Sequence, residues 1–413
     1  MENKKNSQKK LDNNEKYTSV SREKLYNSEN EKKTKINKEK KSSNEKKEYV
    51  VVSEPKSNTL QNNNKNNINN KNSKRKKKKI YKTTILFIIL DIMVAACFLL
   101  MYGPYDKLRN LYVTTAMKTM DHQYLAKVFF SDEDIEKIMA NNYFVTIDED
   151  ANTEDIVIDT EEKNEFKDEF EKELLTREPG NDLYKVLDIN IGTAKGFLVA
   201  IYDPTKVQLI STKQFNVGGY GEKITTMCTR YNGKVCINAG GFVDNGYGSD
   251  IPLGTVIQNG EITWGAESAD SARQEIIGIT NDAKLKLMSN ATANEALAAN
   301  IKDAIVFGPF LIVNGKALEI VGDPWGKAPR VAIAQRKDGV MMFLVIDGEN
   351  YINGASLKDM VEILQRYGAY NAANLDGGQS TSLVINGKLH NNPAAAAKKQ
   401  GGRYVVTGWG LIP

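Results

Sequence analysis

Hydrophobic and polar residues follow a different pattern in each of four successive parts of this chain. Residues 1–79 are polar almost throughout, and a continuous apolar run follows at residues 83–102. Residues 115–139 carry apolar side chains at helical spacing, with a break at Ser131, where the pattern predicts that a second helix begins. The pattern therefore predicts a tail (1–79), a membrane anchor (80–102), a helical stalk with an acidic linker (103–181) and a folded domain (182–413).

The folded domain is predicted to be rich in strands, because short apolar or alternating runs are bounded there by Gly, Asn and Asp turns. Strands are expected at residues 184–191, 196–202, 208–211, 235–238, 255–258, 275–280, 304–306, 311–313, 330–335, 341–346, 373–375 and 382–385. Helical periodicity appears at residues 293–301 and 356–367. The expected fold class is α+β, a mixed, β-sheet-rich domain with flanking helices.

The apolar run has the length of a membrane span. About 20 helical residues at about 1.5 Å each extend about 30 Å, which is the thickness of a bilayer core. Asp91 is the single charged residue in the run, and a cluster of Lys and Arg at residues 74–79 precedes it. Such a cluster orients a helix with its N-terminal side in the cytoplasm. The run lies too far from residue 1 for an ordinary cleaved signal peptide. We therefore expect a single-pass anchor in the cell membrane, with the C-terminal domain extracellular.

Charge separates the tail from the rest of the chain. Residues 1–79 hold 24 Lys and Arg against 10 Asp and Glu, whereas the whole chain has a net charge of only +4. The tail is rich in Lys, Asn, Glu and Ser, so it cannot bury enough apolar surface to fold, and we expect it to be disordered. Nucleic-acid binding is the alternative. The tail nearly lacks the aromatic side chains that stack on bases, so no nucleic-acid partner is expected.

Two further features are structural. Residues 148–178 are strongly acidic and end at Pro179-Gly180, which predicts a linker or an exposed helix around residues 161–175 with solvated carboxylates. Cys228 and Cys236 flank an Asn-Gly turn, and they would form a disulfide in an oxidising exterior or remain two buried thiols.

Several predicted strands of the domain end in polar side chains. Asp376 follows one such strand and is itself followed by two glycines, whose backbone N–H groups are able to approach a ligand closely. Asp347-Gly348 ends another strand, and Asn238 ends a third. Arg330 begins a strand and carries the planar guanidinium that suits phosphate.

In this order, these motifs resemble the phosphodiester glycosidase family, which includes the uncovering enzyme that removes N-acetylglucosamine from a phosphodiester, and bacterial members associated with exopolysaccharide. The motifs are Asn238-Ala239-Gly240-Gly241-Phe242, Pro252-Leu253-Gly254, Pro329-Arg330, Asp347-Gly348, Gly354-Ala355-Ser356, Asn374-Leu375-Asp376-Gly377-Gly378-Gln379-Ser380, Asn391-Asn392-Pro393 and Arg403. The resemblance covers the C-terminal half of the chain. It implies a hydrolase that cleaves sugar-1-phosphodiester linkages in surface glycopolymers or exopolysaccharide.

The resemblance also implies roles for single residues. Asp376 and Asp347 would be the catalytic acid, base or nucleophile, because glycosidases commonly use two carboxyl groups. The substrate-binding residues would be Arg330 and Arg403 on phosphate, Asn238 and Ser380 on sugar or phosphate oxygens, and the backbone of Gly377 and Gly378.

Two departures from the family pattern leave an alternative open. Gln379 replaces a glycine, and Glu349 replaces an arginine after Asp347-Gly348. A non-catalytic glycan-binding or scaffold domain in exopolysaccharide or cell-wall assembly is the alternative. The chain has only His122 and His390, which is too few for a typical two-metal phosphoesterase. No cofactor is expected, although Asp347 and Asp376 would also suit one divalent cation.

Overall fold

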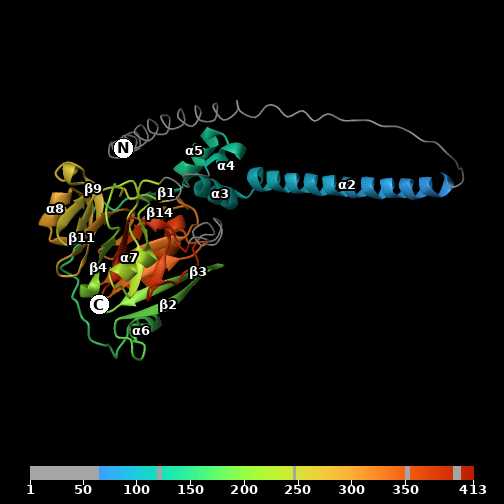
Figure 1. Cartoon of the computed structure of the whole chain (residues 1–413). Coiled ribbons are helices and arrows are strands. Elements are labelled where there is room, and N and C mark those ends of the chain that lie inside the picture. The colour runs from blue at the N-terminus through green and yellow to red at the C-terminus, as the bar shows by residue number, and fades with distance from the viewer. Residues whose placement is uncertain (1–64, 119–122, 245–247, 349–353, 394–400) are drawn as a thin grey trace, which may run out of the picture. The chain divides into compact units, whose positions relative to one another are not determined.

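A computed structural model describes residues 65–118, 123–244, 248–348, 354–393 and 401–413, with side chains from Tyr81 onward (Figure 1). The predicted disordered tail up to residue 64, His122 and Glu349 lie outside the described residues. From Ile85 to Pro413 the chain forms one compact unit. It combines many strands with several helices, as the predicted α+β class requires.

Helix α2 (Lys65–Tyr102) contains the predicted membrane span. Its segment Tyr81–Tyr102 has 22 residues with a mean hydropathy of 2.7, and none of its most apolar window is buried in the protein. At about 1.5 Å per residue the segment is about 33 Å long, so it is long and apolar enough to cross a bilayer.

Three short helices follow: α3 (Asp106–Lys118), α4 (Gln123–Phe129) and α5 (Asp132–Ala140). The predicted start of a helix at Ser131 is confirmed, because its hydroxyl caps α5 by accepting a 3.1 Å bond from the backbone N–H of Asp134. Val113, Ala126 and Ile135 are buried together, which gives these helices a small core of their own.

Seven antiparallel strands form the central sheet, in the order β13-β12-β17-β15-β16-β3-β2. Their bounds are β2 (Tyr184–Ile191), β3 (Ala194–Ile201), β12 (Phe310–Val313), β13 (Lys316–Ala317), β15 (Arg330–Arg336), β16 (Met341–Ile346) and β17 (Ala369–Leu375). Every residue of β15, β16 and β17 is buried, which explains why these strands read as continuous rather than alternating apolar runs.

Two five-stranded antiparallel sheets pack on this sheet. One has the order β19-β18-β6-β21-β4 and the other β10-β9-β11-β7-β8. The first comprises β4 (Val207–Ser211), β6 (Val235–Asn238), β18 (Leu383–Ile385), β19 (Lys388–Leu389) and β21 (Thr407–Leu411). The second comprises β7 (Val256–Gln258), β8 (Glu261–Trp264), β9 (Gln274–Thr280), β10 (Leu285–Ala291) and β11 (Ile301–Val306). Two short pairs, β1 (Tyr143–Val145) with β14 (Glu319–Val321) and β5 (Glu222–Lys223) with β20 (Tyr404–Val405), complete the strands described.

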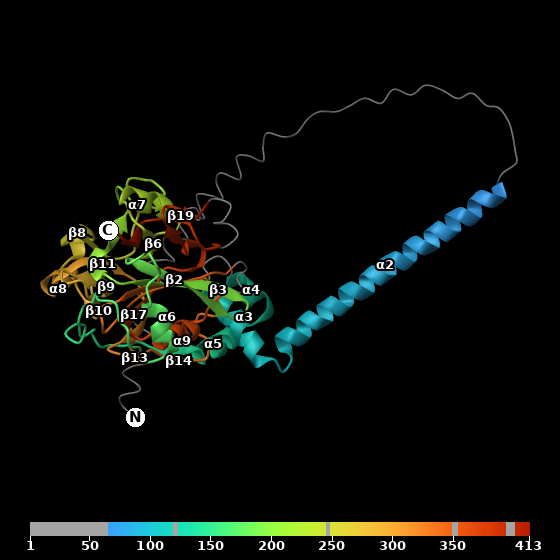
Figure 2. The same cartoon turned by 90° about the horizontal axis from the view of Figure 1, so that it is seen from below.

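The two faces of the central sheet belong to different cores. Val331 and Ile333 of β15 face the five-stranded sheets, in a cluster with Leu209, Ile237 and Ile277. Ala332 and Ala334 belong to the second core, which contains the apolar face of α9 (Leu357–Arg366). Helices α6 (Glu169–Leu175) and α9 lie on one side of the domain and α7 (Ile224–Arg230) on the other (Figure 2). Helix α8 (Ala293–Ala298) packs on β10 and β11.

Of the two alternatives predicted for the acidic segment, a linker or an exposed helix around residues 161–175, the structure contains the short helix α6, and residues 141–181 pack on the domain. Ile156 and Leu174 are buried, and β1 pairs with β14. The backbone N–H of Val157 donates to Lys337 O at 2.8 Å. Apolar residues spaced among the carboxylates anchor this segment, the strap (residues 141–181), on the domain.

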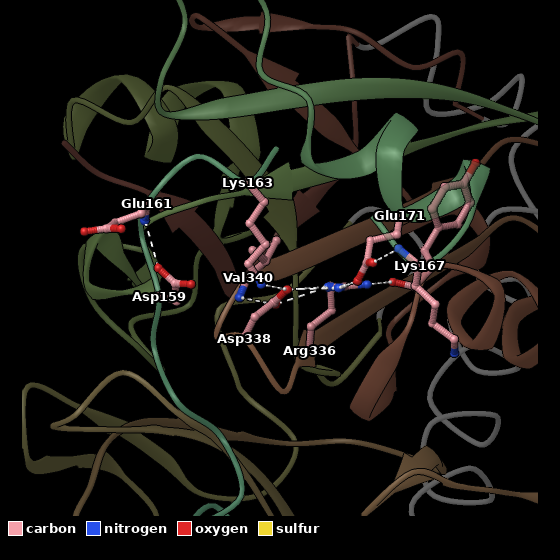
Figure 3. Close-up of polar contacts among 9 residues, drawn as sticks. Asp159, Glu161, Lys163, Lys167, Glu171, Arg336, Asp338 and Val340 are labelled. Carbon is pink, nitrogen blue, oxygen red and sulfur yellow. Dashed lines mark hydrogen bonds and ion pairs between the residues drawn. The ribbon is translucent and has the colours of Figure 1, made fainter. Parts of the chain in front are cut away.

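Buried ion pairs fix the strap to the central sheet (Figure 3). Arg336, at the end of β15, donates to Glu171 of α6 and, at 2.9 Å, to Asp338. Lys163 of the strap approaches the same Asp338 carboxylate at 3.1 Å. The remaining guanidinium nitrogen of Arg336 donates to Tyr367 O at 2.8 Å. Glu171, whose carboxylate the sequence pattern leaves in solvent, is therefore a partner of a buried arginine.

Cys228 of α7 and Cys236 of β6 are joined in a disulfide. Both side chains are buried, and the bond closes a short loop at the Asn232-Gly233 turn. Of the two alternatives that the sequence leaves open, the structure contains the bridge.

Candidate active site

The two predicted catalytic acids, Asp347 and Asp376, lie at the same end of the strands of the central sheet. Strand β15 begins at Arg330, and its two antiparallel neighbours β16 and β17 end beside it. Asp347 follows the end of β16, and Asp376 follows the end of β17. Adjacent strands lie about 4.8 Å apart, so the backbones of these two acids lie about 10 Å apart with β15 between them.

Asn238 joins this end of the central sheet to the neighbouring five-stranded sheet. It is almost completely buried, and its side-chain nitrogen donates to Asp376 O at 2.6 Å. Its side-chain oxygen accepts from the backbone N–H of Ser382 at 2.9 Å. The backbone N–H of Asp376 donates in turn to Ala239 O at 2.9 Å. In the structure Asn238 therefore holds both ends of the loop at residues 376–382, and it is a positioning residue for Asp376.

The carboxyl group of Asp376 has a perturbed acidity. Burial raises the pKa of Asp376 from its usual 3.8 to about 6, and the charge of Asp244 raises it further. A hydrogen bond from Ser380, the charge of Arg403 and the amide of Gly377 act in the opposite direction, but they do not outweigh burial. A pKa of about 6 brings the titration of this carboxyl group much closer to neutral pH than that of an ordinary aspartate, which suits proton transfer.

Arg403 lies close enough to Asp376 to influence its charge, and it forms an ion pair with Asp244. Its guanidinium also lies over the ring of Phe242, 5.2 Å from the centroid. Among the described residues, nothing accepts a hydrogen bond from its buried Nε. A buried donor without a partner is costly, by about 1–3 kcal/mol, so this nitrogen favours an anion from outside the chain.

Sequence reasoning missed Asp244. The residue follows Asn238-Ala239-Gly240-Gly241-Phe242 by two positions, and this motif was read only for its amide and glycines. The signal available in the sequence was a carboxylate shortly after a strand that ends in a polar residue. Only the fold shows that Arg403, 159 residues later, is its partner.

The sequence predicts that Arg330 binds phosphate, but in the structure its guanidinium donates to backbone oxygens. Its side chain is buried on the face of the central sheet that carries α9, and it donates to three backbone oxygens. The bonds are Nε to Ala355 O at 3.2 Å and Nη2 to Trp325 O and Gly326 O at 3.1 Å each. Burial lowers the pKa of Arg330 to about 10, so it remains a cation at neutral pH. In the structure Arg330 clamps two loops, and a phosphate would have to displace these carbonyls.

Asp347 fixes a segment beside the loop of Asp376. Its two carboxylate oxygens accept from the Asn391 side chain and the Asn392 backbone N–H, each at 2.8 Å. Asn391 also accepts from the backbone N–H of Leu383 at 2.7 Å, directly after the loop. Asp347 and Asp376 therefore belong to one hydrogen-bonded network through Asn391 and the loop.

Backbone hydrogen bonds hold the loop that contains Gly377 and Gly378. The N–H of Gly378 donates to Pro329 O at 2.9 Å, so this expected substrate donor is already occupied in the structure. Gly378 carries the left-handed backbone, with φ of +58°, and Gln379 does not, so a side chain is tolerated there. At Gly377 an added Cβ would lie 2.6 Å from Pro329 O, so only glycine fits. Ser380 is buried and bonds the Asp376 carboxyl.

Two further candidate features of the site are His390 and a divalent cation. His390 is exposed and packs edge-to-face on Phe197, with 4.7 Å between the ring centroids. Across the residues that the structure describes, no three His, Cys, Asp or Glu side chains are placed to hold a metal ion.

Comparison with known proteins finds a family similar to this domain. Residues 231–412 match the family model of the phosphodiester glycosidases, the family that the ordered motifs resemble.

Two kinds of relative share this domain. The SPbeta prophage-derived uncharacterized protein YomE of Bacillus subtilis is 28% identical over 178 residues, which are 41% of this chain and 27% of that protein. The N-acetylglucosamine-1-phosphodiester alpha-N-acetylglucosaminidase of Bos taurus is 37% identical over 65 residues, 16% of this chain and 12% of that protein. The chain thus spans well under a third of the length of these relatives.

Solved structures show more distant similarity. The catalytic domain of zebrafish N-acetylglucosamine-1-phosphodiester alpha-N-acetylglucosaminidase, auto-inhibited by its pro-peptide, has a TM-score of 0.45 at 20% identity. That match covers 56% of this chain and 82% of the other. A putative exported protein of Burkholderia pseudomallei has a TM-score of 0.37 at 15% identity, covering 53% of this chain and 74% of the other.

Proposed function

We propose that this protein is a membrane-anchored hydrolase that cleaves sugar-1-phosphodiester linkages in glycopolymers outside the cytoplasm. The family of residues 231–412 supports the reaction class. The observation that carries the proposal is that Arg403 influences the charge of Asp376, whose pKa is raised to about 6, and that among the described residues no group accepts a hydrogen bond from the buried Nε of Arg403. Together they offer a proton and a cation to the two reacting parts of a sugar phosphodiester.

In the proposed reaction the bond between C1 of the sugar and the bridging oxygen breaks, and a water oxygen bonds to C1. The bridging oxygen leaves with the phosphate as a phosphomonoester, which takes up its second proton with a pKa of about 6. Proton transfer is most efficient between groups of matched acidity, so Asp376 suits this leaving group as general acid. Arg403 would bind the phosphodiester anion and stabilise the charge that grows on it.

A second carboxyl group would activate the water or attack C1. Asp347 remains a candidate because it lies at the same end of the central sheet and belongs to the network of Asp376. Asp244 is the other candidate, since it pairs with Arg403 and influences the charge of Asp376. Asp347→Asn and Asp244→Asn separate the two, because only the variant at the acting carboxylate loses turnover when both proteins fold.

Three features support a location outside the cytoplasm. Tyr81–Tyr102 has the length and hydropathy of a membrane span, and a cluster of basic residues precedes it. Cys228 and Cys236 form a disulfide, which persists in oxidising compartments. A polymer outside the membrane, such as exopolysaccharide or wall polymer, is therefore the proposed substrate.

The test is release of reducing sugar from a panel of sugar-1-phosphodiesters by the full chain in detergent. Wild type is expected to release sugar from at least one member, and Asp376→Asn to lose at least a hundredfold in rate while its fold is intact. Tight binding of polymer with no turnover, unchanged in Asp376→Asn, would instead establish a glycan-binding or scaffold domain.

A further inference from the structure

A cavity of about 520 Å³ opens in the same domain, away from Asp376. Its lining includes Ser211 at the end of β4, Gln214 and Phe215 after that strand, and Gln258, Thr263 and Trp264 of the β7–β8 hairpin. Its volume lies within the range of about 300–1,000 Å³ that is typical of small-molecule sites. None of the proposed catalytic residues lines it, so it is a separate compartment.

The cavity begins at the end of β4, in the five-stranded sheet whose strand β6 carries Asn238. Ser211, the last residue of β4, is paired with Thr407, and the next residue of β21, Gly408, is paired with Asn238. Strands β4 and β6 therefore flank β21 and end at the same level, about 10 Å apart. Since Asn238 bonds Asp376 O, the cavity lies about the length of one or two sugar rings from the Asp376 loop.

The chemistry of the lining suits a sugar. Phe215 and Trp264 are half-buried and pack edge-to-face with 6.1 Å between ring centroids, which presents an apolar aromatic wall. The lining also contains the hydroxyl of Ser211, which donates to the amide oxygen of Gln258 at 2.9 Å, and the Gln258 nitrogen donates to Leu209 O at 2.9 Å. The exposed amide of Gln214 offers further polar groups to a ligand. Among the described lining residues, Lys213 is the one charged side chain. An aromatic wall with neutral amides and hydroxyls recognises an uncharged sugar ring better than a phosphate.

Hydrogen bonds to Asp250 fix the loop that forms one wall of the cavity. Asp250 is buried, and one of its carboxylate oxygens accepts from the backbone N–H groups of Val217 and Gly219, each at 2.8 Å. Its backbone oxygen accepts from Asn216 at 3.0 Å. Three bonds to one buried residue therefore fix the loop that carries Phe215.

A second aromatic contact follows this loop in the sequence. Tyr220 is exposed and contacts Tyr404, with 6.3 Å between ring centroids. Tyr404 is adjacent in sequence to Arg403, whose guanidinium lies over Phe242. The chain that leaves Phe215 therefore contacts, at Tyr220, the residue next to Arg403.

We propose that this cavity is an accessory glycan subsite that holds a sugar unit further along the polymer whose phosphodiester is cleaved at Asp376. The proposal rests on the proposed function, because it names the class of substrate: an oligosaccharide or polymer rather than a single sugar phosphodiester. Binding energy at the cavity then adds to affinity for long substrates and leaves short ones unaffected.

The experiment measures binding and cleavage by the full chain in detergent. The probes are N-acetylglucosamine oligomers of one to six units for binding, and the methyl phosphodiester of N-acetylglucosamine for cleavage. Wild type is expected to bind the longer oligomers at least tenfold more tightly than the monomer. Gln214→Trp, which fills the cavity from an exposed position, is expected to remove this dependence on length and to change cleavage of the methyl phosphodiester less than twofold.

Gln365→Trp is the matched control, since Gln365 is exposed on α9 and does not line the cavity. Trp264→Ala provides a second test by removing the aromatic wall. The proposal is overturned if affinity does not rise with oligomer length, or if the rise survives in both cavity variants. Length-dependent binding without any cleavage would contradict the hydrolase and leave the subsite standing.

Discussion

Asp376→Asn should abolish activity and at the same time stabilise the fold at neutral pH. The reason is the raised pKa of Asp376, which means that the folded protein disfavours the ionised carboxylate. Asparagine has nearly the same shape and carries no charge, so it removes this cost. Residues placed for reaction commonly cost stability, and their replacement commonly recovers it.

The magnitude follows from the shift of the pKa. A rise from 3.8 to about 6 is about two units, which corresponds to about 3 kcal/mol. Because the carboxyl group is only partly buried, solvent reduces the effect, and about 1–3 kcal/mol is the expected range. Below about pH 3 the carboxyl is protonated in both the folded and the unfolded protein, so the two variants should be equally stable. The advantage of Asp376→Asn should grow between about pH 4 and 6 and stay constant above about pH 7.

The assay is urea unfolding of both proteins at several pH values, followed by tryptophan fluorescence. All three tryptophans of the chain, Trp264, Trp325 and Trp409, lie in the domain, so the signal reports its unfolding. Asp188→Asn, at an exposed position of β2, is the control and should show no such pH dependence. A variant that is less stable than wild type at pH 7.5, or a difference that is the same at every pH, would refute the reasoning.

Three other substitutions test how the site and its support are held. Asn238→Ala should lower the free energy of unfolding by about 2–4 kcal/mol, because it leaves two buried backbone groups without partners; a loss under 1 kcal/mol in urea unfolding would contradict this. Arg336→Met should cost about 3–5 kcal/mol at pH 7, since it leaves the buried carboxylate of Asp338 unpaired. Burial raises the pKa of Asp338, but Arg336 and Lys163 together lower it below its usual value, so this penalty should shrink as pH falls below about 4, and a constant penalty would speak against the ion pair. Replacing Cys228 and Cys236 together by serine should cost about 2.5 kcal/mol in thermal or urea unfolding, the value expected for so short a closed loop, and no change on reduction of wild type would argue against the bridge.

The strands of the central sheet were predictable because burial on both faces leaves a clear apolar run. The strands expected at residues 184–191, 235–238 and 341–346 have the same bounds as β2, β6 and β16. Strand β21 was missed because its sequence, Thr-Gly-Trp-Gly-Leu, contains two glycines. Close packing explains them: a Cβ at Gly408 would lie 2.5 Å from Ile237 O. The strap was missed for the opposite reason, since a few apolar anchors were hidden among carboxylates.

Sequence motifs located the parts of the candidate site but not their roles. Arg330 and Arg403 both stand in the family pattern, and the sequence gives no reason to separate them. The structure distinguishes them through partners far away in the chain, because Arg330 is bonded by carbonyls near Trp325 and Ala355, whereas Arg403 keeps a buried nitrogen without a partner among the described residues. Such pairings depend on the packing of loops, which hydrophobic periodicity does not encode.

The most direct test of the account is the position of bond cleavage in water labelled with ¹⁸O. The full chain in detergent would hydrolyse a sugar-1-phosphodiester in this water, and ³¹P NMR would read the isotope content of the released phosphomonoester. A glycosidase that breaks the bond from C1 to oxygen leaves the phosphate unlabelled, and this is the predicted result. An ¹⁸O atom on the phosphate would show attack at phosphorus and would contradict the proposed chemistry of Asp376 and Arg403.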